Sequence, residues 1–405
     1  MKWRNFLIVF LAVLAAFLAY NYFAQPFLKF FPEPVIEIIP ESSKESETKI
    51  VFENLTTREK ISQMLMLPLL LDDEADENVE INVEENEPLK LIIQHQPGFI
   101  IYFGEEINYD TAEKYQAKIN ESFTEDQILP LLAVDHEGGQ VQRLSGKGFT
   151  VLPSMRQLTD AVVFSEEDAD VKALNARERT ALFNQSAKEL SEIGISLVLA
   201  PTVDYSASTN PILTNRIGND PDKIVQIAQE YIRAFSNWQI MPVLKHFPGI
   251  GSIKKDLHLT ADTVELDKND TIIFEKLLDQ YRNVGVMSAH VRLQDKLAGQ
   301  PCSLSKQCLD QLFQFYPEVL VITDDLLMES ASYIPGSREK KSLSMIAIEA
   351  IEAGNHVLLF GRGFDYAQLN SLLNALEAKY EDSLDFQKQV NLASKKILSL
   401  KGLNN

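Results

Sequence analysis

Cysteine is almost absent from this sequence, and the spacing of the two cysteines argues against a metal-binding motif and against a disulfide framework. The chain has 405 residues and two cysteines, Cys302 and Cys308, whose spacing matches neither a metal-binding motif nor a disulfide framework. We expect both to be ordinary small residues, with a Cys302–Cys308 disulfide as the alternative. No glycine-rich phosphate loop or dinucleotide fingerprint occurs either. The sequence therefore predicts no cofactor and no metal site.

Positive charge is also scarce. The chain has 38 Lys and Arg residues against 58 Asp and Glu residues, a formal net charge of -20. Binding a nucleic acid requires a basic face, so we exclude a nucleic-acid partner. Hydrophobic residues make up 45% of the chain, which is enough for one large α/β domain or two ordinary ones.

One long apolar run stands at the N-terminus. Lys2 and Arg4 precede a run that extends to Ala24 and is broken only by Asn21. Its length lies between that of a signal-peptide core and that of a short membrane span. Because no small-x-small cleavage site ends it, a signal anchor over residues 1–24 is the preferred interpretation, with a cleaved signal peptide as the alternative. Positive charge on its amino side predicts that the remainder lies on the periplasmic or extracellular side of the cell membrane, or is secreted if the signal is cleaved.

The next segment has the composition of a spacer. Residues 25–50 are rich in proline, serine and glutamate. Such a segment cannot bury enough apolar surface to fold by itself. We interpret it as a stem.

From about residue 54, short apolar runs alternate with amphipathic segments. The runs predict eight strands, at Met64–Leu71, Phe99–Phe103, Leu129–Asp135, Ser196–Val203, Pro242–His246, Val284–His290, Val319–Asp324 and His356–Phe360. The amphipathic segments predict helices at Thr111–Ser122, Phe183–Ile193, Pro221–Trp238, Thr271–Asn283, Lys306–Phe315, Lys341–Ala353 and Phe386–Leu400. Eight strands alternating with helices favour a single (β/α)₈ TIM-type barrel over residues 51–405, with a doubly wound open sheet as the alternative.

An acidic insertion, residues 72–88, interrupts this pattern between the first strand and its helix. We expect it to be a solvated loop. On a barrel it would lie on the face that holds the active site, where it could repel anionic ligands. It lacks the spacing and central glycine of an EF-hand calcium loop.

Polar residues gather where the apolar runs end. The ends of the third to seventh runs lead to Asp135, His136, Glu137 and Arg143; to Asp204, Asn210 and Arg216; to Lys245, His246, Asp256 and His258; to His290; and to Asp324 and Asp325. In a barrel these ends converge on one rim. A ring of carboxylates, cations and imidazoles suits a ligand with many hydroxyl groups, because charged groups make strong hydrogen bonds. Neither a nucleophile elbow nor an HExxH motif is present, so the pattern fits neither a Ser-based triad nor a metal site.

Residues from about 54 to 365 resemble glycoside hydrolase family 3, of the single-domain β-N-acetylglucosaminidase (β-hexosaminidase) type. The matching stretches are Ala133–Gly139, Asn215–Gly218, Lys245–Gly249, Asp256–His258, Pro301–Ser305 and Thr323–Leu326. The resemblance implies a barrel, a retaining mechanism and no cofactor. It implies that Asp324 is the nucleophile and that His258, oriented by Asp256, is the acid/base. It also implies that five residues contact the sugar: Asp135, Arg143, Arg216, Lys245 and His246.

Two positions depart from that family pattern. Ile250 and Ser252 stand where the family usually has His and Asp, in the loop that carries the implied dyad. An export segment is also unusual, because members of this type in Gram-negative bacteria usually lie in the cytosol. The retained Asp324, Asp256 and His258 keep the activity prediction in place.

The leading hypothesis is a retaining exo-β-N-acetylglucosaminidase that acts on peptidoglycan fragments through a covalent glycosyl-Asp intermediate. Its predicted partners are a glycan substrate containing N-acetylglucosamine and the membrane. Retaining hydrolysis needs a carboxylate to attack and an acid to protonate the leaving oxygen, and histidine titrates near neutral pH. The alternatives are a related β-glycosidase or phosphorylase, since a neutral histidine base would not repel phosphate, and an inactive, membrane-tethered sugar-binding protein.

Overall fold

The computed structural model describes residues 52–72, 81–160, 174–213, 215–294, 299–334, 337 and 339–402. These residues belong to one compact unit, Glu47–Asn405. The predicted signal segment, 1–24, and the stem, 25–50, lie outside the described residues. Within the described ranges, no helix is both long enough and apolar enough to span a bilayer.

Eight parallel strands form one sheet that nearly closes into a barrel. They are β1 (Leu65–Leu70), β2 (Phe99–Phe103), β3 (Leu131–Val134), β6 (Ile195–Val198), β7 (Met241–Phe247), β9 (Gly285–Ser288), β11 (Leu320–Thr323) and β12 (Leu358–Leu359). Their order in the sheet is β11-β9-β7-β6-β3-β2-β1-β12. The two outer strands approach each other, because Ile322 and Val357 form a parallel bridge and Thr323 N–H donates to Val357 O at 2.9 Å. This arrangement is consistent with a TIM-type barrel.

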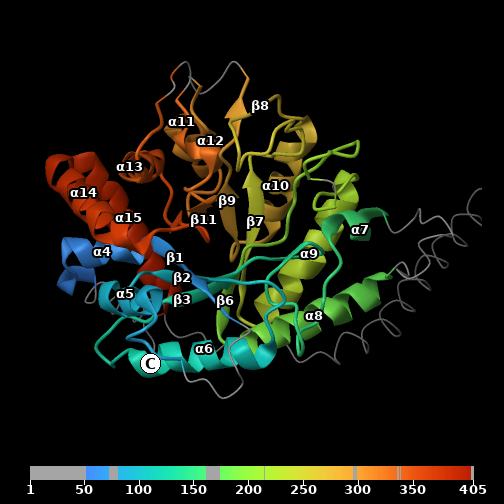
Figure 1. The fold of residues 1–405 in the computed structure, drawn as a ribbon. Helices are drawn as coiled ribbons and strands as arrows, with labels where there is room; N and C mark the ends of the chain where they lie inside the picture. Colours follow the sequence, from blue (N-terminus) through green and yellow to red (C-terminus); the bar gives the residue numbers. More distant parts are fainter. Residues whose placement is uncertain are drawn as a thin grey trace, which may run out of the picture. The chain divides into compact units, whose positions relative to one another are not determined.

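Helices pack around the outside of the strands (Figure 1). They are α4 (Thr57–Gln63), α5 (Glu87–His95), α6 (Tyr109–Ser122), α7 (Met155–Asp160), α8 (Ala176–Glu192), α9 (Pro221–Asn237), α10 (Lys268–Gln280), α11 (Lys306–Phe313), α12 (Glu329–Ser332), α13 (Leu343–Ala353), α14 (Leu369–Asp382) and α15 (Leu384–Leu400). Short elements complete the fold: β4 (His136–Gly138), β5 (Val141–Gln142), β8 (Thr263–Val264), β10 (Arg292–Leu293), η3 (Cys302–Leu304) and η4 (Tyr366–Gln368). Helices on one face and packed side chains on the other bury the strands on both faces, which explains why they are continuous apolar runs.

The ends of several helices differ from the prediction because capping residues lie upstream of the apolar pattern. Asn175 and Glu178 form a capping box, so α8 begins at Ala176, a position the apolar periodicity from Phe183 does not indicate. Asp267 and Asp270 do the same for α10. The end of the predicted acidic insertion is helical rather than a loop, because Asn86 caps α5 and Glu87 is its first residue.

The last two helices bring the end of the domain back to its start. Helix α14, which the sequence pattern did not predict, and α15 both pack against α4, and Figure 1 shows blue α4 beside red α14 and α15. Ser394 Oγ donates to Lys60 O at 2.7 Å, and Lys401 Nζ donates to Gln63 Oε1 at 2.7 Å. Since α4 leads directly into β1, this contact lies at the amino ends of the strands.

The cysteines correct one expectation. Cys302 and Cys308 form a disulfide with their Cα atoms 5.3 Å apart, so the prediction of two unpaired small residues is wrong. Both are buried. A 3₁₀ turn and the first turn of α11 bring them together, and sequence spacing alone does not reveal this approach.

Candidate active site

A pocket of about 270 Å³ opens at the carboxyl ends of the strands. Its polar lining is Asp135, Glu137, Arg143, Arg216, Lys245, His246, Asp256, His258, Asp324 and Asp325. All eight residues that the sequence predicted for the site lie in this pocket. Glu137, which lay in a noted motif but was given no role, and Asp325 join them. The apolar remainder includes Phe103, Ile250 and Met328.

A buried network of charges forms one wall of the pocket. Lys245 Nζ lies 2.8 Å from Asp135 Oδ1 and 2.7 Å from Glu137 Oε1. Arg216 donates to both oxygens of Glu137, from Nη2 at 2.7 Å and from Nε at 3.0 Å. Arg143 Nε is farther away, 3.9 Å from Asp135 Oδ2. A two-pronged pair of this kind holds the guanidinium in a fixed orientation.

The network keeps its members charged despite burial. Burial alone would raise the pKa of Glu137, but Arg216 and Lys245 lower it well below its usual range. Burial likewise opposes the charge on Lys245, yet the Asp135 and Glu137 carboxylates raise its pKa. Glu137 is therefore the central anion of the wall. Its place two residues after Asp135 in an extended segment, where alternate side chains share a face, is the signal that could have identified it.

Asp204 is a second residue whose role the sequence did not indicate. Its Oδ2 accepts hydrogen bonds from the backbone N–H of His246 at 3.1 Å and from the ring Nδ1 at 2.7 Å. Its Oδ1 accepts from Ile250 N–H at 2.9 Å. Asp204 is fully buried, so it fixes the orientation of His246 and the start of the following loop.

Asp324 lies at the end of β11 and is partly accessible from the pocket. Its backbone N–H donates to Ser288 O at 2.9 Å, which fixes it to neighbouring β9. Its Oδ1 accepts the Asp325 N–H at 2.9 Å. Burial opposes ionisation, but the imidazoles of His246 and His290 and the Asp325 N–H shift the pKa of Asp324 below its ordinary value. The side chain is therefore an anion at neutral pH.

Asp325 has a different environment. Its Oδ1 accepts the N–H groups of Leu327 at 2.9 Å and Gly361 at 2.8 Å. A Cβ on Gly361 would lie 2.0 Å from Asp325 Oδ2, so only glycine fits there. Burial raises the pKa of Asp325 to about 6. These contacts describe a side chain that holds a turn.

Two further histidines lie behind the pocket. His290 is buried, and its Nε2 donates to Asp325 O at 2.9 Å while Nδ1 lies 2.5 Å from Ser303 Oγ. Burial lowers the pKa of His290, and its two hydrogen bonds support the Asp324–Asp325 turn. His136 is buried against Ser186 at 2.7 Å and does not line the pocket.

The predicted dyad lies on the loop that follows β7. His258 Nδ1 lies 2.8 Å from Asp256 Oδ1, and the same oxygen accepts the His258 N–H at 2.9 Å. The side chains are 65% and 42% exposed, respectively, so the dyad faces the mouth while Asp324 lies deeper. The bonds from His258 outweigh partial burial and lower the pKa of Asp256. Nδ1 is occupied, and Nε2 remains for a substrate.

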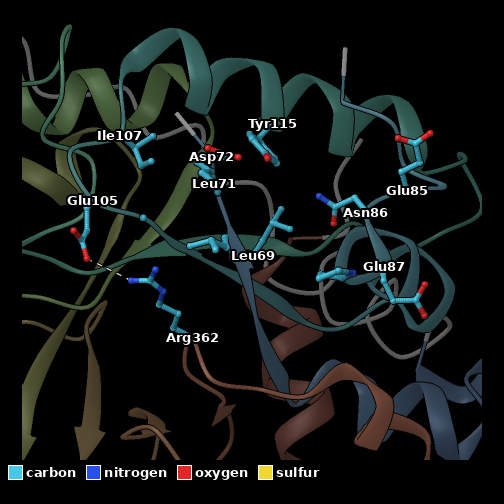
Figure 2. Close-up of a pocket in the computed structure, with 13 residues that line it drawn as sticks. Leu69, Leu71, Asp72, Glu85, Asn86, Glu87, Glu105, Ile107, Tyr115 and Arg362 are labelled. Carbon is cyan, nitrogen blue, oxygen red and sulfur yellow. Dashed lines mark hydrogen bonds and ion pairs between the residues drawn. The ribbon is translucent and has the colours of Figure 1, made fainter. Parts of the chain in front are cut away.

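A larger cavity, about 790 Å³, lies beside the acidic insertion. Figure 2 shows Leu69, Leu71 and Tyr115 against it, with Asp72 and Asn86. Glu85, Glu87 and Glu105 also line it, with the exposed ion pair between Arg362 and Glu105 at 3.4 Å. None of the predicted site residues lines this cavity, so the smaller pocket is the candidate active site. No group of His, Cys, Asp and Glu within the described ranges has the arrangement of a metal site.

Comparison with known proteins identifies the family. The glycosyl hydrolase family 3 N terminal domain matches residues 56–400. The chain belongs to glycoside hydrolase family 3. It is therefore a glycoside hydrolase.

Curated relatives and solved structures agree with this assignment. The chain is 30% identical over 329 residues to a beta-hexosaminidase of Tolumonas auensis, and the match covers 79% of this chain and 90% of the relative. It is 31% identical over 296 residues to a beta-hexosaminidase of Photobacterium profundum, covering 71% and 80%. A beta-N-acetylhexosaminidase from Beutenbergia cavernae has the same fold, with a TM-score of 0.71 at 24% identity over 86% of this chain and 99% of that one. A family 3 beta-N-acetylglucosaminidase from a Paenibacillus strain has a TM-score of 0.69 at 25% identity, covering 85% and 63%.

Proposed function

We propose that this protein is a retaining exo-β-N-acetylglucosaminidase. The observation that carries the proposal is that Asp324 and His258 line one pocket in opposite environments. Asp324 is an enclosed carboxylate with a lowered pKa, and His258 is exposed at the mouth with one ring nitrogen bound to Asp256. Retaining glycosidases need such a pair, one group to attack and one to move a proton. The curated relatives are beta-hexosaminidases, and the name of the Paenibacillus structure, a beta-N-acetylglucosaminidase, supplies the choice of N-acetylglucosamine.

In the first step, an Asp324 oxygen attacks the anomeric carbon while the bond from that carbon to the aglycone oxygen breaks. His258 gives its Nε2 proton to the leaving oxygen, so that an alcohol departs rather than an alkoxide. Asp256 accepts the Nδ1–H and thereby holds the ring in the tautomer that presents Nε2. A glycosyl ester on Asp324 remains.

In the second step, water attacks the same carbon and the ester bond to Asp324 breaks. His258 Nε2 takes a proton from the water, which restores the starting state of both residues. The charged wall of Asp135, Glu137 and Lys245 stays in place throughout. It orients the sugar hydroxyls with groups that need no rearrangement, the condition under which electrostatic stabilisation is most effective.

We further propose that the substrates are peptidoglycan fragments met outside the cytoplasm, with residues 1–24 as a signal anchor. The disulfide between Cys302 and Cys308 supports an oxidising location, because such cross-links persist in exported proteins and are rare in the cytosol.

The test is hydrolysis of an aryl N-acetyl-β-glucosaminide by the purified protein, with and without added phosphate. Free N-acetylglucosamine should form in both cases, with net retention of anomeric configuration at the first product. Asp324→Ala should abolish turnover. A sugar phosphate as the main product would favour the phosphorylase alternative, and binding without turnover would favour the inactive sugar-binding protein.

A further inference from the structure

Two residues of the loop that carries the dyad, Ile250 and Ser252, give it little side-chain hydrogen bonding. Ile250 is buried against the pocket. Ser252 is exposed, and its Oγ donates to Glu265 O at the long distance of 3.4 Å. Neither residue can hold the loop through a strong side-chain hydrogen bond. The loop must therefore be held by residues outside these two positions.

Asn210 holds the first part of the loop from outside. Its Nδ2 donates to Gly251 O and Ile253 O, both at 2.9 Å. Its Oδ1 accepts Ile212 N–H at 2.8 Å, so both ends of the amide are used. Asn210 is buried, and a buried amide with satisfied partners fixes its neighbours in one geometry.

Asp262 holds the next part from the far side of the dyad. Its Oδ2 accepts the N–H groups of Lys254 at 2.6 Å and Lys255 at 3.0 Å. Its own carbonyl accepts the N–H of Arg292 at 3.1 Å, which fixes Asp262 to the β8–β10 pair. The segment from Lys254 to Asp262 is thus closed on itself, with Asp256 and His258 inside the closed segment.

We propose that Asp262, together with Asn210, is a positioning residue for the acid/base dyad. The two side chains bind four backbone groups, Gly251 O, Ile253 O, Lys254 N–H and Lys255 N–H, in the segment directly before Asp256. On the other side, Leu257 O and His258 O accept the Ser330 and Glu329 N–H groups at 3.2 and 3.3 Å. With its amino end fixed by Asn210 and Asp262, the loop keeps Nε2 of His258 at the mouth. Asp262 supplies a restraint that Ile250 and Ser252 do not give.

The inference rests on the proposed function and predicts a particular kinetic pattern. Loss of dyad geometry should weaken proton transfer, which matters for an alkyl leaving group and little for a nitrophenyl group. In the full chain, Asp262→Ala should lower kcat/KM about tenfold or more on a methyl N-acetyl-β-glucosaminide and less than about threefold on the nitrophenyl glycoside. Asp262→Asn, which keeps one acceptor oxygen, should show a smaller change in the ratio of the two rates.

A matched control is Asn175→Ala. Asn175 also accepts two backbone N–H groups, from Arg177 at 3.0 Å and Glu178 at 3.1 Å, but it caps α8 and does not line the pocket. This variant should lower Tm and leave the ratio of the two rates unchanged. Equal losses on both substrates in Asp262→Ala, or no loss, would overturn the inference.

Hydrogen exchange tests the same inference without catalysis. Backbone amides in peptides spanning 253–258 should exchange several times faster in Asp262→Ala than in wild type or Asn175→Ala. Unchanged protection of this segment would overturn the positioning role whatever the kinetics. A wild-type protein inactive on both glycosides would instead overturn the proposed function, while the exchange result would still decide the role of Asp262 in the loop.

Discussion

In the turn after β11, the adjacent carboxyl groups of Asp324 and Asp325 have different roles because their surroundings differ. Asp325 uses its Oδ1 to hold the N–H groups of Leu327 and Gly361, and burial raises its pKa to about 6. Asp324 has a lowered pKa and accepts one backbone bond. Neighbouring groups whose pKa values are driven apart typically have separate roles, and of these two carboxyl groups Asp324 has the lowered pKa.

A mechanism-based label should therefore attach to Asp324. A 2-fluoro glycosyl substrate slows the second step, so a stable sugar adduct should accumulate on the peptide containing Thr323, Asp324 and Asp325. Fragmentation by mass spectrometry should place the added mass on Asp324. A label on Asp325, or no adduct from an active enzyme, would contradict the assignment.

Substitution of His258 should have an effect that depends on the leaving group. An acid/base residue contributes roughly 10²–10⁴-fold, and His258→Ala should lose most of that with a natural sugar aglycone. With a nitrophenyl leaving group, cleavage scarcely needs the proton, so the glycosyl intermediate should accumulate and azide should restore turnover as a β-glycosyl azide. Asp256→Asn should show a milder form of the same pattern.

The rates of His258→Ala on the two substrates, together with chromatography of the azide product, decide between two roles for His258. Equal and small losses on both substrates, with no response to azide, would mean that the residue is only a solvated part of the loop. Such a result would favour the inactive sugar-binding alternative.

The sequence could predict which charged residues gather at the rim, because each follows an apolar run that ends at the same face of a barrel. It could not predict the partners inside the network. Glu137 and Asp204 were noted only as members of polar stretches, and their roles depend on residues 79 and 42 positions away. The hydrogen bonds that Asp262 accepts from the Lys254 and Lys255 N–H groups depend in turn on how the loop folds back. These pairings are fixed by tertiary packing.

Among the elements, α10 begins next to the active site with an unusual carboxyl group. Asp270 closes the capping box by accepting the Asp267 N–H at 3.0 Å. Asp270 is buried, and it lies against Gly249, where an added Cβ would come within 2.6 Å of Asp270 Cγ. Burial, with the nearby Asp204 carboxylate, raises the pKa of Asp270 to about 7.

This environment predicts a loss of stability as pH rises. Because the folded pKa lies above the value of 3.8 expected for the unfolded chain, the native state binds more protons between these values. Stability should fall from about pH 4 to about pH 7, by an amount on the order of 4 kcal/mol if the group acts alone. Asp270→Asn keeps an acceptor for the cap and removes the ionisation.

Urea unfolding at pH 5 and pH 8 checks this prediction. Asp270→Asn should be more stable than wild type at pH 8, and the difference should shrink at pH 5. The exposed partner in the same capping box gives a control, since Asp267→Asn should change stability similarly at both pH values. If Asp270→Asn lost as much stability between pH 5 and pH 8 as wild type does, this result would contradict the prediction.

The helix ends show which parts of the elements were predictable. Apolar periodicity locates the buried middle of α8 and α9 well, because those residues face the barrel. The polar first turn of α8 is set by its cap, Asn175, and was missed, whereas α9 begins at Pro221 as predicted. The disulfide escaped prediction for a related reason, since the approach of Cys302 to Cys308 depends on a tight turn that only the packed structure imposes.

For the whole molecule, removal of residues 1–50 should leave a soluble and fully active protein. The described core begins with Phe52, whose buried ring lies 4.2 Å from Lys60 Nζ and 4.4 Å from Lys395 Nζ, so a cut at 50 leaves this packing intact. Activity on an aryl N-acetyl-β-glucosaminide and gel filtration check the outcome. An inactive or aggregated truncation would refute the interpretation of residues 25–50 as a spacer.

The contact of α15 with α4 has a practical consequence for immobilising the enzyme or fusing it to another protein. The Ser394–Lys60 and Lys401–Gln63 bonds bring both ends of the described domain to the amino ends of the strands, and the pocket opens at the opposite ends. A resin, a bead or a fused protein joined at either end would then leave the mouth open to diffusing substrate. The same geometry suits the domain to circular permutation, because a short peptide can join ends that already lie together and new ends can be opened in an exposed loop.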